Sequence, residues 1–280
     1  MLTQFIRAVL LSAALSSLAL NTAQAGDRSS CDGRAEIIIR NAYPDAHKSD
    51  GAIFRLGEST IQINDGETIG DTPHTVKCRV WLANPQFTLV AVPLIKSTNE
   101  DGTVGDLELL VIDTASLAVK HRLLLADRMN DDAISVSGVE FDTARYRLTQ
   151  NQTAFGLRIS TTGSSRPNPY DDVGLWLYVI EKGSLRPVLD GLVVSQNAGE
   201  WDTNCAGEFQ SSESTLSISS NKTHGYADIA VIETKSTKTS FVGKDNDCKN
   251  KTVTSEPQTL RLVYDGEQYS IPEDRRAVAE

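Results

Sequence analysis

The sequence predicts an all-β, antiparallel fold, and three observations lead to this prediction. Short apolar runs rich in Val, Ile, Leu and Thr recur along the chain, separated by Gly, Asn, Asp and Pro. Two of these runs, residues 175–181 and 260–265, alternate apolar and polar positions with the period of a strand. Beyond the N-terminal apolar stretch, no window of about 11 residues keeps the 3.6-residue period of a helix.

Eleven segments fit strands by these criteria. In chain order they are residues 35–40, 76–82, 87–95, 107–113, 118–125, 134–141, 154–160, 175–181, 215–220, 226–233 and 260–266. Val, Ile, Leu and aromatic residues in runs of this length, bounded by turn-forming residues, are typical of strands. So many short strands without intervening helices indicate an all-β architecture.

Three longer segments resemble one another and predict hairpins. Residues 107–125, 175–192 and 260–271 each read as a strand, a turn containing Asp, Glu or Gly, and a second strand. A further strand candidate precedes each of them in the chain. Repeated units of one strand plus a hairpin predict either a propeller-like arrangement or a β-sandwich.

The first 25 residues have the pattern of a secretory signal peptide. Arg7 is their only charged residue, an apolar run follows it, and Ala23 and Ala25 form an A-x-A cleavage site. We therefore expect a periplasmic or secreted protein, with one all-β domain over residues 26–280 or two halves at 26–100 and 101–280. The mature chain has no apolar run near the roughly 20 residues of a membrane helix, so we expect no transmembrane segment.

The charge balance narrows the range of partners. The chain has 27 basic and 37 acidic residues, a net charge of −10. A negative field repels phosphate backbones and anionic lipids, which argues against nucleic acid and membrane surfaces as partners. An unknown protein or a cell-envelope glycan is the expected partner.

The four cysteines predict two disulfide bonds. Cys31, Cys78, Cys205 and Cys248 all lie in the exported part, where oxidising conditions favour disulfides. Three pairings are possible, and we favour Cys31–Cys78 with Cys205–Cys248 because each closes a local loop. No C-x-x-C spacing occurs, so neither a zinc site nor a redox site is expected.

Three long segments are predicted as loops, residues 160–174, 195–209 and 235–252. The first two carry the residue types that dominate binding hot spots, aromatic and arginine side chains, together with acids. The candidate binding residues are Arg166, Tyr170, Asp171, Asp172, Glu200, Trp201 and Asp202. Trp176 and Trp201 are both expected to belong to the core.

Residues 217–233 resemble an integrin-type FG-GAP propeller repeat, a calcium-loop motif, through the stretch GYADIAV. Only Asp228 matches the acidic ligand pattern of that repeat, whereas Ser220, Lys222 and His224 occupy the leading ligand positions. A lysine ammonium repels a cation, so no metal is expected here, and Asp228 is predicted to cap a core strand.

A wider resemblance connects the chain to a group of proteins. The stretches VIDTASLAV, TGSSRPNPY, GEWDTNCAGEF and GYADIAV are similar to uncharacterised exported proteins of Gram-negative bacteria. This resemblance implies export and an all-β fold, and it implies no activity.

Catalytic patterns are missing from the sequence. There is no G-x-S-x-G, H-E-x-x-H, P-loop or dinucleotide fingerprint, so no cofactor and no catalytic residue are assigned. The leading hypothesis is a non-enzymatic binding or envelope-interaction module. The alternative is a glycan-active hydrolase that pairs Asp171 or Asp172 with Glu200 or Asp202, because glycoside hydrolysis needs two carboxyl groups flanking the scissile bond.

Overall fold

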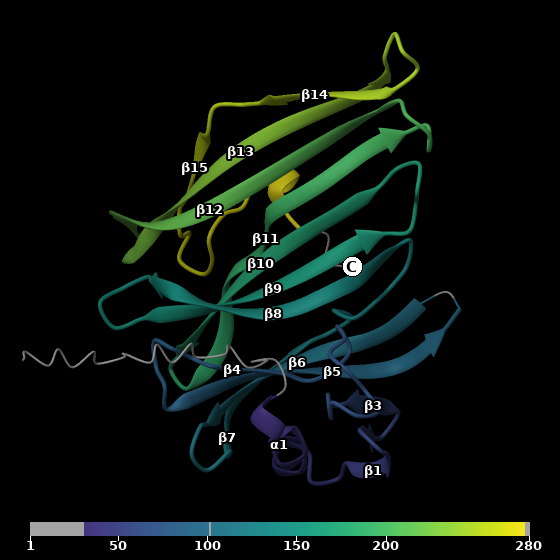
Figure 1. Ribbon diagram of the computed structural model, residues 1–280. Coiled ribbons are helices and arrows are strands. Elements are labelled where there is room, and N and C mark those ends of the chain that lie inside the picture. The colour runs from purple at the N-terminus through teal and green to yellow at the C-terminus, as the bar shows by residue number, and fades with distance from the viewer. Residues whose placement is uncertain (1–30, 101, 278–280) are drawn as a thin grey trace, which may run out of the picture.

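Two antiparallel sheets and one short α-helix dominate the computed structural model, which describes residues 31–100 and 102–277 (Figure 1). The all-β, antiparallel prediction is confirmed. The sheets stack face to face across a shared apolar core, so the architecture is a sandwich and not a ring of propeller blades. The predicted signal peptide at residues 1–25 lies outside the described residues.

The first sheet has the strand order β1-β2-β3-β5-β6-β7, and β4 pairs with β5. Its strands are β1 (His47–Asp50), β2 (Ile53–Leu56), β3 (Ser59–Gln62), β4 (Lys77–Val80), β5 (Phe87–Asn99), β6 (Gly102–Asp113) and β7 (Val119–Leu125). The β6–β7 hairpin is the one predicted at residues 107–125, and the Asp113 carboxylate accepts hydrogen bonds from Ser116 in its turn.

The second sheet has the order β14-β13-β12-β11-β10-β9-β8, and β15 pairs with β13. Its strands are β8 (Ile134–Arg147), β9 (Thr153–Gly163), β10 (Tyr170–Glu181), β11 (Ser184–Trp201), β12 (Gly207–Thr223), β13 (Tyr226–Val242), β14 (Cys248–Thr254) and β15 (Gln258–Leu262). The predicted hairpin at residues 175–192 is β10–β11, and Lys182 and Gly183 form its turn with positive φ angles of 50° and 82°.

Alternation along the central strands divides the core into layers. On β5, Leu89 and Ala91 face the second sheet, whereas Val90 and Val92 face the helix. The core between the sheets is completed from the second sheet by β8, β9 and β10, which contribute residues such as Phe155. Strand β10 is buried on both faces over residues 174–179, because further chain segments cover its outer side.

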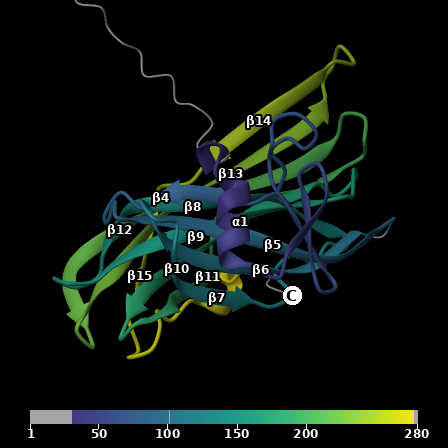
Figure 2. The same cartoon turned by 90° about the horizontal axis from the view of Figure 1, so that it is seen from below.

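Helix α1 (Ala35–Ala42) corrects the strand predicted at residues 35–40. Figure 2 shows it lying across the first sheet, where the chain packs Ile38 and Ile39 against the sheet and leaves Ile37 53% exposed. Three consecutive isoleucines look like a strand in sequence, yet Ala35, Ile38 and Ile39 form a helical stripe. Burial of that stripe outweighs the strand preference of β-branched residues. The short 3-10 helix η1 (Cys31–Gly33) precedes α1.

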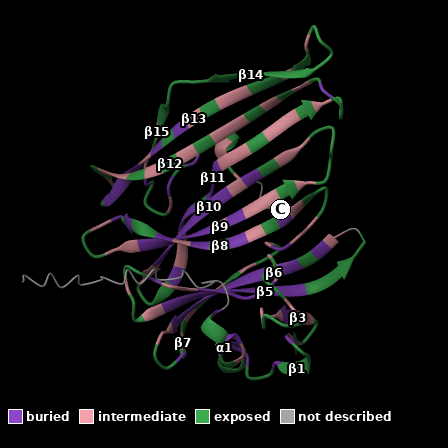
Figure 3. Cartoon of the chain, in the orientation of Figure 1, coloured by how far each residue is buried: buried purple, intermediate pink, exposed green. Residues whose placement is uncertain are grey.

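The three predicted loops are mostly strand, which is a second correction. Within residues 160–174 only 164–169 lie outside β9 and β10, and within 195–209 only 202–206 lie outside β11 and β12. Residues 235–252 form most of the β13–β14 hairpin. Backbone pairing to a neighbouring strand forms these ladders despite a composition rich in Ser, Thr, Asn and Gly. Figure 3 shows why the apolar signal is weak: β14 is exposed, and the adjoining ends of β12 and β13 are a mixture of intermediate and exposed residues.

Both predicted disulfide bonds are confirmed. Cys31–Cys78 ties the segment before α1 to β4, and Cys205–Cys248 ties the β11–β12 turn to the start of β14. Each bond joins two elements that do not pair with each other through backbone hydrogen bonds. It closes a loop of 47 or 43 residues, which limits the freedom of the unfolded chain.

The C-terminal segment runs beside the first half of β11, because β11 pairs with β12 only over residues 195–201. Tyr269 donates its backbone N–H to Val188 at 2.7 Å, and Ala277 donates to Gly191 at 2.7 Å. The 3-10 helix η2 (Glu273–Arg275) lies between these contacts. Ala277 thereby reaches the centre of the second sheet.

Candidate functional site

The two segments that carry the predicted binding residues lie side by side. Trp201 donates its backbone N–H to the Pro167 carbonyl at 2.7 Å, and Gly199 donates to the Pro169 carbonyl at 3.0 Å. The Arg166 guanidinium carbon lies 5.5 Å from the centroid of the Trp201 ring. Trp201 is half-buried at this contact and does not belong to the core, contrary to expectation.

Strand alternation separates the predicted residues onto two faces of the second sheet. We call the face of β10 that carries Trp176 the inner face, because it packs against the first sheet. Tyr170 and Asp172 share that face, whereas Asp171 points to the outer face, where it accepts a 2.8 Å hydrogen bond from Asn197. Neighbouring positions in sequence therefore belong to different surfaces.

The carboxylates of the hydrolase hypothesis are not brought together. Asp172 is opposite Gln196 on β11, and Glu200 lies four residues further along, so that their backbone positions are about 13 Å apart along the strand, whereas Asp171 points to the other face. Retaining and inverting glycosidases need separations of about 5–9.5 Å. Asp202 caps its own turn by accepting the backbone N–H groups of Asn204 and Cys205 at 2.9 and 2.8 Å, which lowers its pKa.

A cavity of about 190 Å³ opens beside the inner face of the second sheet. Its floor is the inner face of β8, β9 and β10, and its rim is the loop of residues 126–133 that crosses from the first sheet to the second. Tyr170 and Asp172 line it, so two of the predicted residues belong to a concave site. Arg128 and Trp176 also line it.

The crossover loop is fixed to the first sheet by backbone hydrogen bonds. Met129 donates to the Gly105 carbonyl at 3.0 Å, and Asp131 donates to the Thr103 carbonyl at 2.7 Å. The Asp131 carboxylate accepts the Val136 N–H at 2.8 Å, which joins the loop to the start of β8. These bonds hold the residue that precedes them, Arg128, beside the cavity in a preorganised position.

Arg128 and Trp176 form the most unusual contact of the site. The guanidinium carbon of Arg128 lies 4.9 Å from the centroid of the Trp176 ring. The Arg128 Nη1 and Trp176 Nε1 atoms are buried, and neither has a hydrogen-bond partner among the described residues. Buried N–H groups without acceptors are costly, so a ligand that supplies acceptors would recover that free energy.

Asp172 is the buried acid of the cavity, with 5% of its surface exposed. It accepts hydrogen bonds from the Thr161 hydroxyl at 2.6 Å and the Tyr170 hydroxyl at 2.9 Å. Burial raises the pKa of Tyr170, and so does the neighbouring Asp172 carboxylate, so the phenol stays protonated and donates. In the described part of the chain, no cation forms an ion pair with Asp172.

Two glycines make room for the indole ring of Trp176. A Cβ atom at Gly174 would lie 2.6 Å from the ring, and one at Gly191 would lie 3.1 Å from it. Ala277 closes the same corner, since its Cβ would be 2.8 Å from a Cβ at Gly174. The tight fit fixes the ring in the cavity wall.

Sequence reasoning missed Arg128 and treated Trp176 as a core residue only. Trp176 does belong to the core, with 3% of its surface exposed, and it also lines the cavity. The available signal was a single arginine among acids in the stretch ADRMNDDA, between two predicted strands. Only the stacking of the two sheets places this loop over β10.

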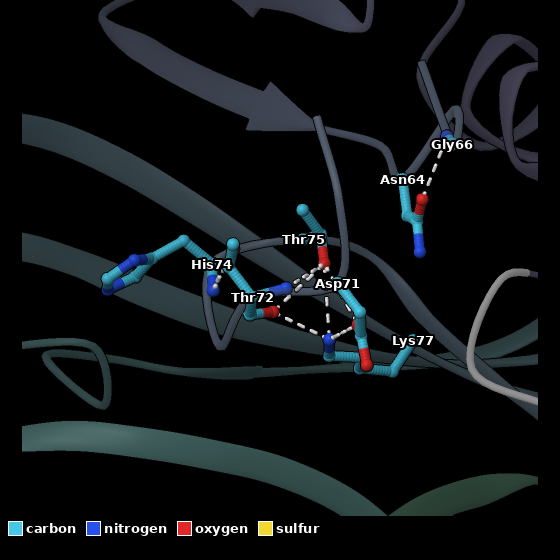
Figure 4. A network of polar contacts seen from close by, with 7 residues as sticks. All are labelled: Asn64, Gly66, Asp71, Thr72, His74, Thr75 and Lys77. Atoms are coloured by element: carbon cyan, nitrogen blue, oxygen red, sulfur yellow. Dashed lines mark hydrogen bonds and ion pairs between the residues drawn. The ribbon is translucent and has the colours of Figure 1, made fainter. Parts of the chain in front are cut away.

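A larger cavity of about 380 Å³ lies between β8 and the segment before β4, lined by Asp71, Lys77 and Glu140 among others. Figure 4 shows the polar network beside it, in which the Lys77 ammonium contacts the Asp71 carboxylate, the Thr72 carbonyl at 2.6 Å and the Thr75 hydroxyl at 3.1 Å. These contacts use the three donors of the lysine. The network therefore serves to hold the loop and leaves no unmet donor on Lys77.

Asp228, the residue matched to the propeller repeat, lies buried at the start of β13. Its carboxylate accepts hydrogen bonds from Thr223 at 2.7 Å and from Arg261 at 2.9 Å. In residues 31–100 and 102–277 no three His, Cys, Asp or Glu side chains converge as metal ligands. The same residues contain no helix of the length and apolarity that a membrane crossing requires.

Comparison of the chain with protein-family models, with curated proteins and with solved structures gave no match.

Proposed function

We propose that this protein is an exported, periplasmic or secreted binding module that takes a small ligand into the cavity beside the inner face of its second sheet. The observation that carries the proposal is the pair of buried, unpartnered N–H groups on Arg128 and Trp176 in the cavity wall. Native proteins seldom leave such groups unsatisfied, and exceptions often mark functional sites.

Several further features support the proposal. The sequence pattern of residues 1–25 is typical of a secretory signal, and the two disulfide bonds suit an oxidising compartment. The cavity walls belong to rigid strands and to a loop tied to the first sheet, as a preorganised binding site requires.

The hydrolase alternative receives less support from the geometry. Its two carboxylate groups lie on separate parts of the second sheet, and neither Glu200 nor Asp202 lines the cavity that contains Asp172. A protein or a cell-envelope glycan that contacts the outer face near Arg166 and Trp201 is compatible with the same binding module.

A thermal-shift screen tests the proposal. The mature chain, residues 26–280, is screened against amino acids, peptides, muropeptides, oligosaccharides and the low-molecular-mass fraction of an envelope extract. At least one component is expected to raise the thermal midpoint, and Arg128→Gln is expected to abolish that rise. Arg166→Gln is the matched control, because Arg166 also packs on a tryptophan but lies outside the cavity. If no component gives a rise that depends on Arg128, the proposal is wrong.

A further inference from the structure

We infer that the cavity recognises a small zwitterion with an apolar body, that is, a free amino acid or a dipeptide. This inference rests on the proposed function, because it names the class of ligand that the same cavity would bind.

The cavity contains two opposite charges that do not neutralise each other. Arg128 and Asp172 both line it, yet they form no ion pair with each other or with any other described residue. Asp172 is buried and Arg128 is half-buried, and burial of a charge without a partner is unfavourable. A ligand carrying both a carboxylate and an ammonium group would provide each charge with its partner.

The donors on one side of the cavity suit a carboxylate. Arg128 offers the unpartnered Nη1 group and Trp176 offers the unpartnered indole N–H, and the two side chains are in contact. A carboxylate has two oxygen atoms and can accept both hydrogen bonds. Hydrogen bonds between ionised groups are roughly twice as strong as neutral ones.

The acids on the other side suit an ammonium group. Asp172 accepts two hydroxyl hydrogen bonds, and a carboxylate has lone pairs for about two more. Asp127 and Asp132 also line the cavity. Three acids would repel a ligand that carries only negative charge, and Arg128 would oppose one that carries only positive charge.

The remaining walls define the body of the ligand. Ile134, Val136 and Ile159 give the cavity an apolar side. Its volume of about 190 Å³ is below the range of roughly 300–1,000 Å³ that is usual for drug-sized ligands. An amino acid or dipeptide with an aliphatic side chain matches both the size and the apolar wall.

Sugars fit this cavity less well. Sugar-binding sites commonly offer an open aromatic face, but Trp176 has Arg128 over its ring and Gly174 and Gly191 against it. The ring is therefore a packed wall of the cavity, with one face already covered by Arg128.

Isothermal titration calorimetry with four probes tests the inference on the mature chain with its disulfides intact. The probes are leucine, leucylleucine, N-acetylleucine, which lacks the ammonium group, and leucinamide, which lacks the carboxylate. We expect saturable binding of leucine or leucylleucine. The ligand that binds more tightly shows whether Arg128 and Asp172 are spaced for the charged ends of one residue or of two. Loss of either charge on the ligand should weaken binding at least about tenfold.

Two variants that remove one charge each assign the charges to residues. Arg128→Gln should bind leucine and leucinamide with nearly equal affinity, because the charged partner of the carboxylate is gone. Asp172→Asn should likewise bind leucine and N-acetylleucine equally. Asp171→Asn and Arg166→Gln are the matched controls outside the cavity and should keep the discrimination of the wild type. A merely structural role would weaken all probes alike, and circular dichroism confirms that each variant is folded.

Equal affinity for all four probes, or discrimination that survives both cavity variants, would overturn the zwitterion inference. If the four probes fail while a sugar or another compound that is not an amino acid or a peptide binds in an Arg128-dependent manner, the inference is wrong and the proposed function stands. If no compound binds in that manner, both are wrong.

Discussion

The guanidinium carbon of Arg128 lies 4.9 Å from the ring centroid of Trp176, and this contact joins the loop between the sheets to the centre of the second sheet. The attraction of a cation to an indole face contributes about 0.5–2 kcal/mol. The guanidinium group covers one face of the ring, whereas Arg128 Nη1 and Trp176 Nε1 have no hydrogen-bond partner among the described residues. Stability and binding thus depend on different atoms of the same two residues.

Gly174→Ala should destabilise the protein and obstruct the cavity. The new methyl group would lie 2.6 Å from the Trp176 ring and 2.8 Å from Ala277, so the ring or the C-terminal segment must shift. We expect the free energy of unfolding in urea to fall by about 1–3 kcal/mol, as is usual for overpacking. The control is Gly70→Ala, where nothing lies within 4 Å of the added atom. Equal stability of the two variants would contradict the described packing of Trp176.

Reduction of the two disulfide bonds should lower the thermal midpoint markedly. They close loops with sequence separations of 47 and 43 residues, each of which is worth about 4 kcal/mol in the chain-entropy model. Cys31, Cys78 and Cys205 are buried, whereas Cys248 is exposed, so mild reductant should open Cys205–Cys248 first, by attack at Cys248. Alkylation followed by mass spectrometry measures the order, and earlier labelling of Cys31 and Cys78 would contradict it.

The second sheet should lose stability in acid partly through Asp228. Burial alone would raise the pKa of Asp228, but hydrogen bonds from Thr223 and Arg261 outweigh burial and lower it. A carboxyl group with a lowered folded pKa stabilises the protein above its unfolded pKa of about 4, and this stabilisation is lost as the pH falls through the folded value.

Asp228→Asn should therefore be less stable than the wild type at pH 7, and the difference should shrink as the pH is lowered below about 4. Urea denaturation of the two proteins at pH 7 and at a pH below about 4 measures this difference in the free energy of unfolding. A deficit that stays constant with pH would show that the charge of Asp228 does not contribute.

Tyr43→Phe should weaken the attachment of α1 to the first sheet. The Tyr43 hydroxyl donates a 2.5 Å hydrogen bond to the buried Glu108 carboxylate, and the Arg122 guanidinium carbon lies 5.2 Å from the centroid of the tyrosine ring. Removal of the hydroxyl leaves one oxygen of the buried Glu108 carboxylate without this hydrogen-bond donor. The expected cost is about 1–3 kcal/mol in the free energy of unfolding. Denaturation in urea tests this, and an unchanged midpoint would mean that water replaces the hydroxyl at no cost.

The strands that sequence patterns predict correctly are those whose apolar residues face a core. Residues 87–95 and 175–181 lie in β5 and β10, which are buried on both faces over much of their length. Strand β14 gives no such signal because all seven of its residues are exposed. The helix at residues 35–42 was missed because two turns are too short to show a helical period beside three β-branched residues.

The candidate site was predictable in part. Tyr170 and Asp172 were recognised from their residue types, and both line the cavity. Asp171 points to the opposite face of the sheet because side chains alternate along a strand. This could not be predicted, because residues 170–173 were expected in a loop and not in β10. Arg128 could not be placed, because its position over β10 depends on how two sheets stack and not on any local pattern.

The most direct test of the cavity as the binding site is a ¹H–¹⁵N spectrum of the three indole N–H groups, which belong to Trp81, Trp176 and Trp201. Trp176→Phe assigns the resonance of the cavity. Titration with leucine, and then with the low-molecular-mass fraction of an envelope extract, should shift the Trp176 resonance and leave that of Trp201 in place. A Trp176 resonance that stays fixed throughout, or a shift confined to Trp201, would contradict the account.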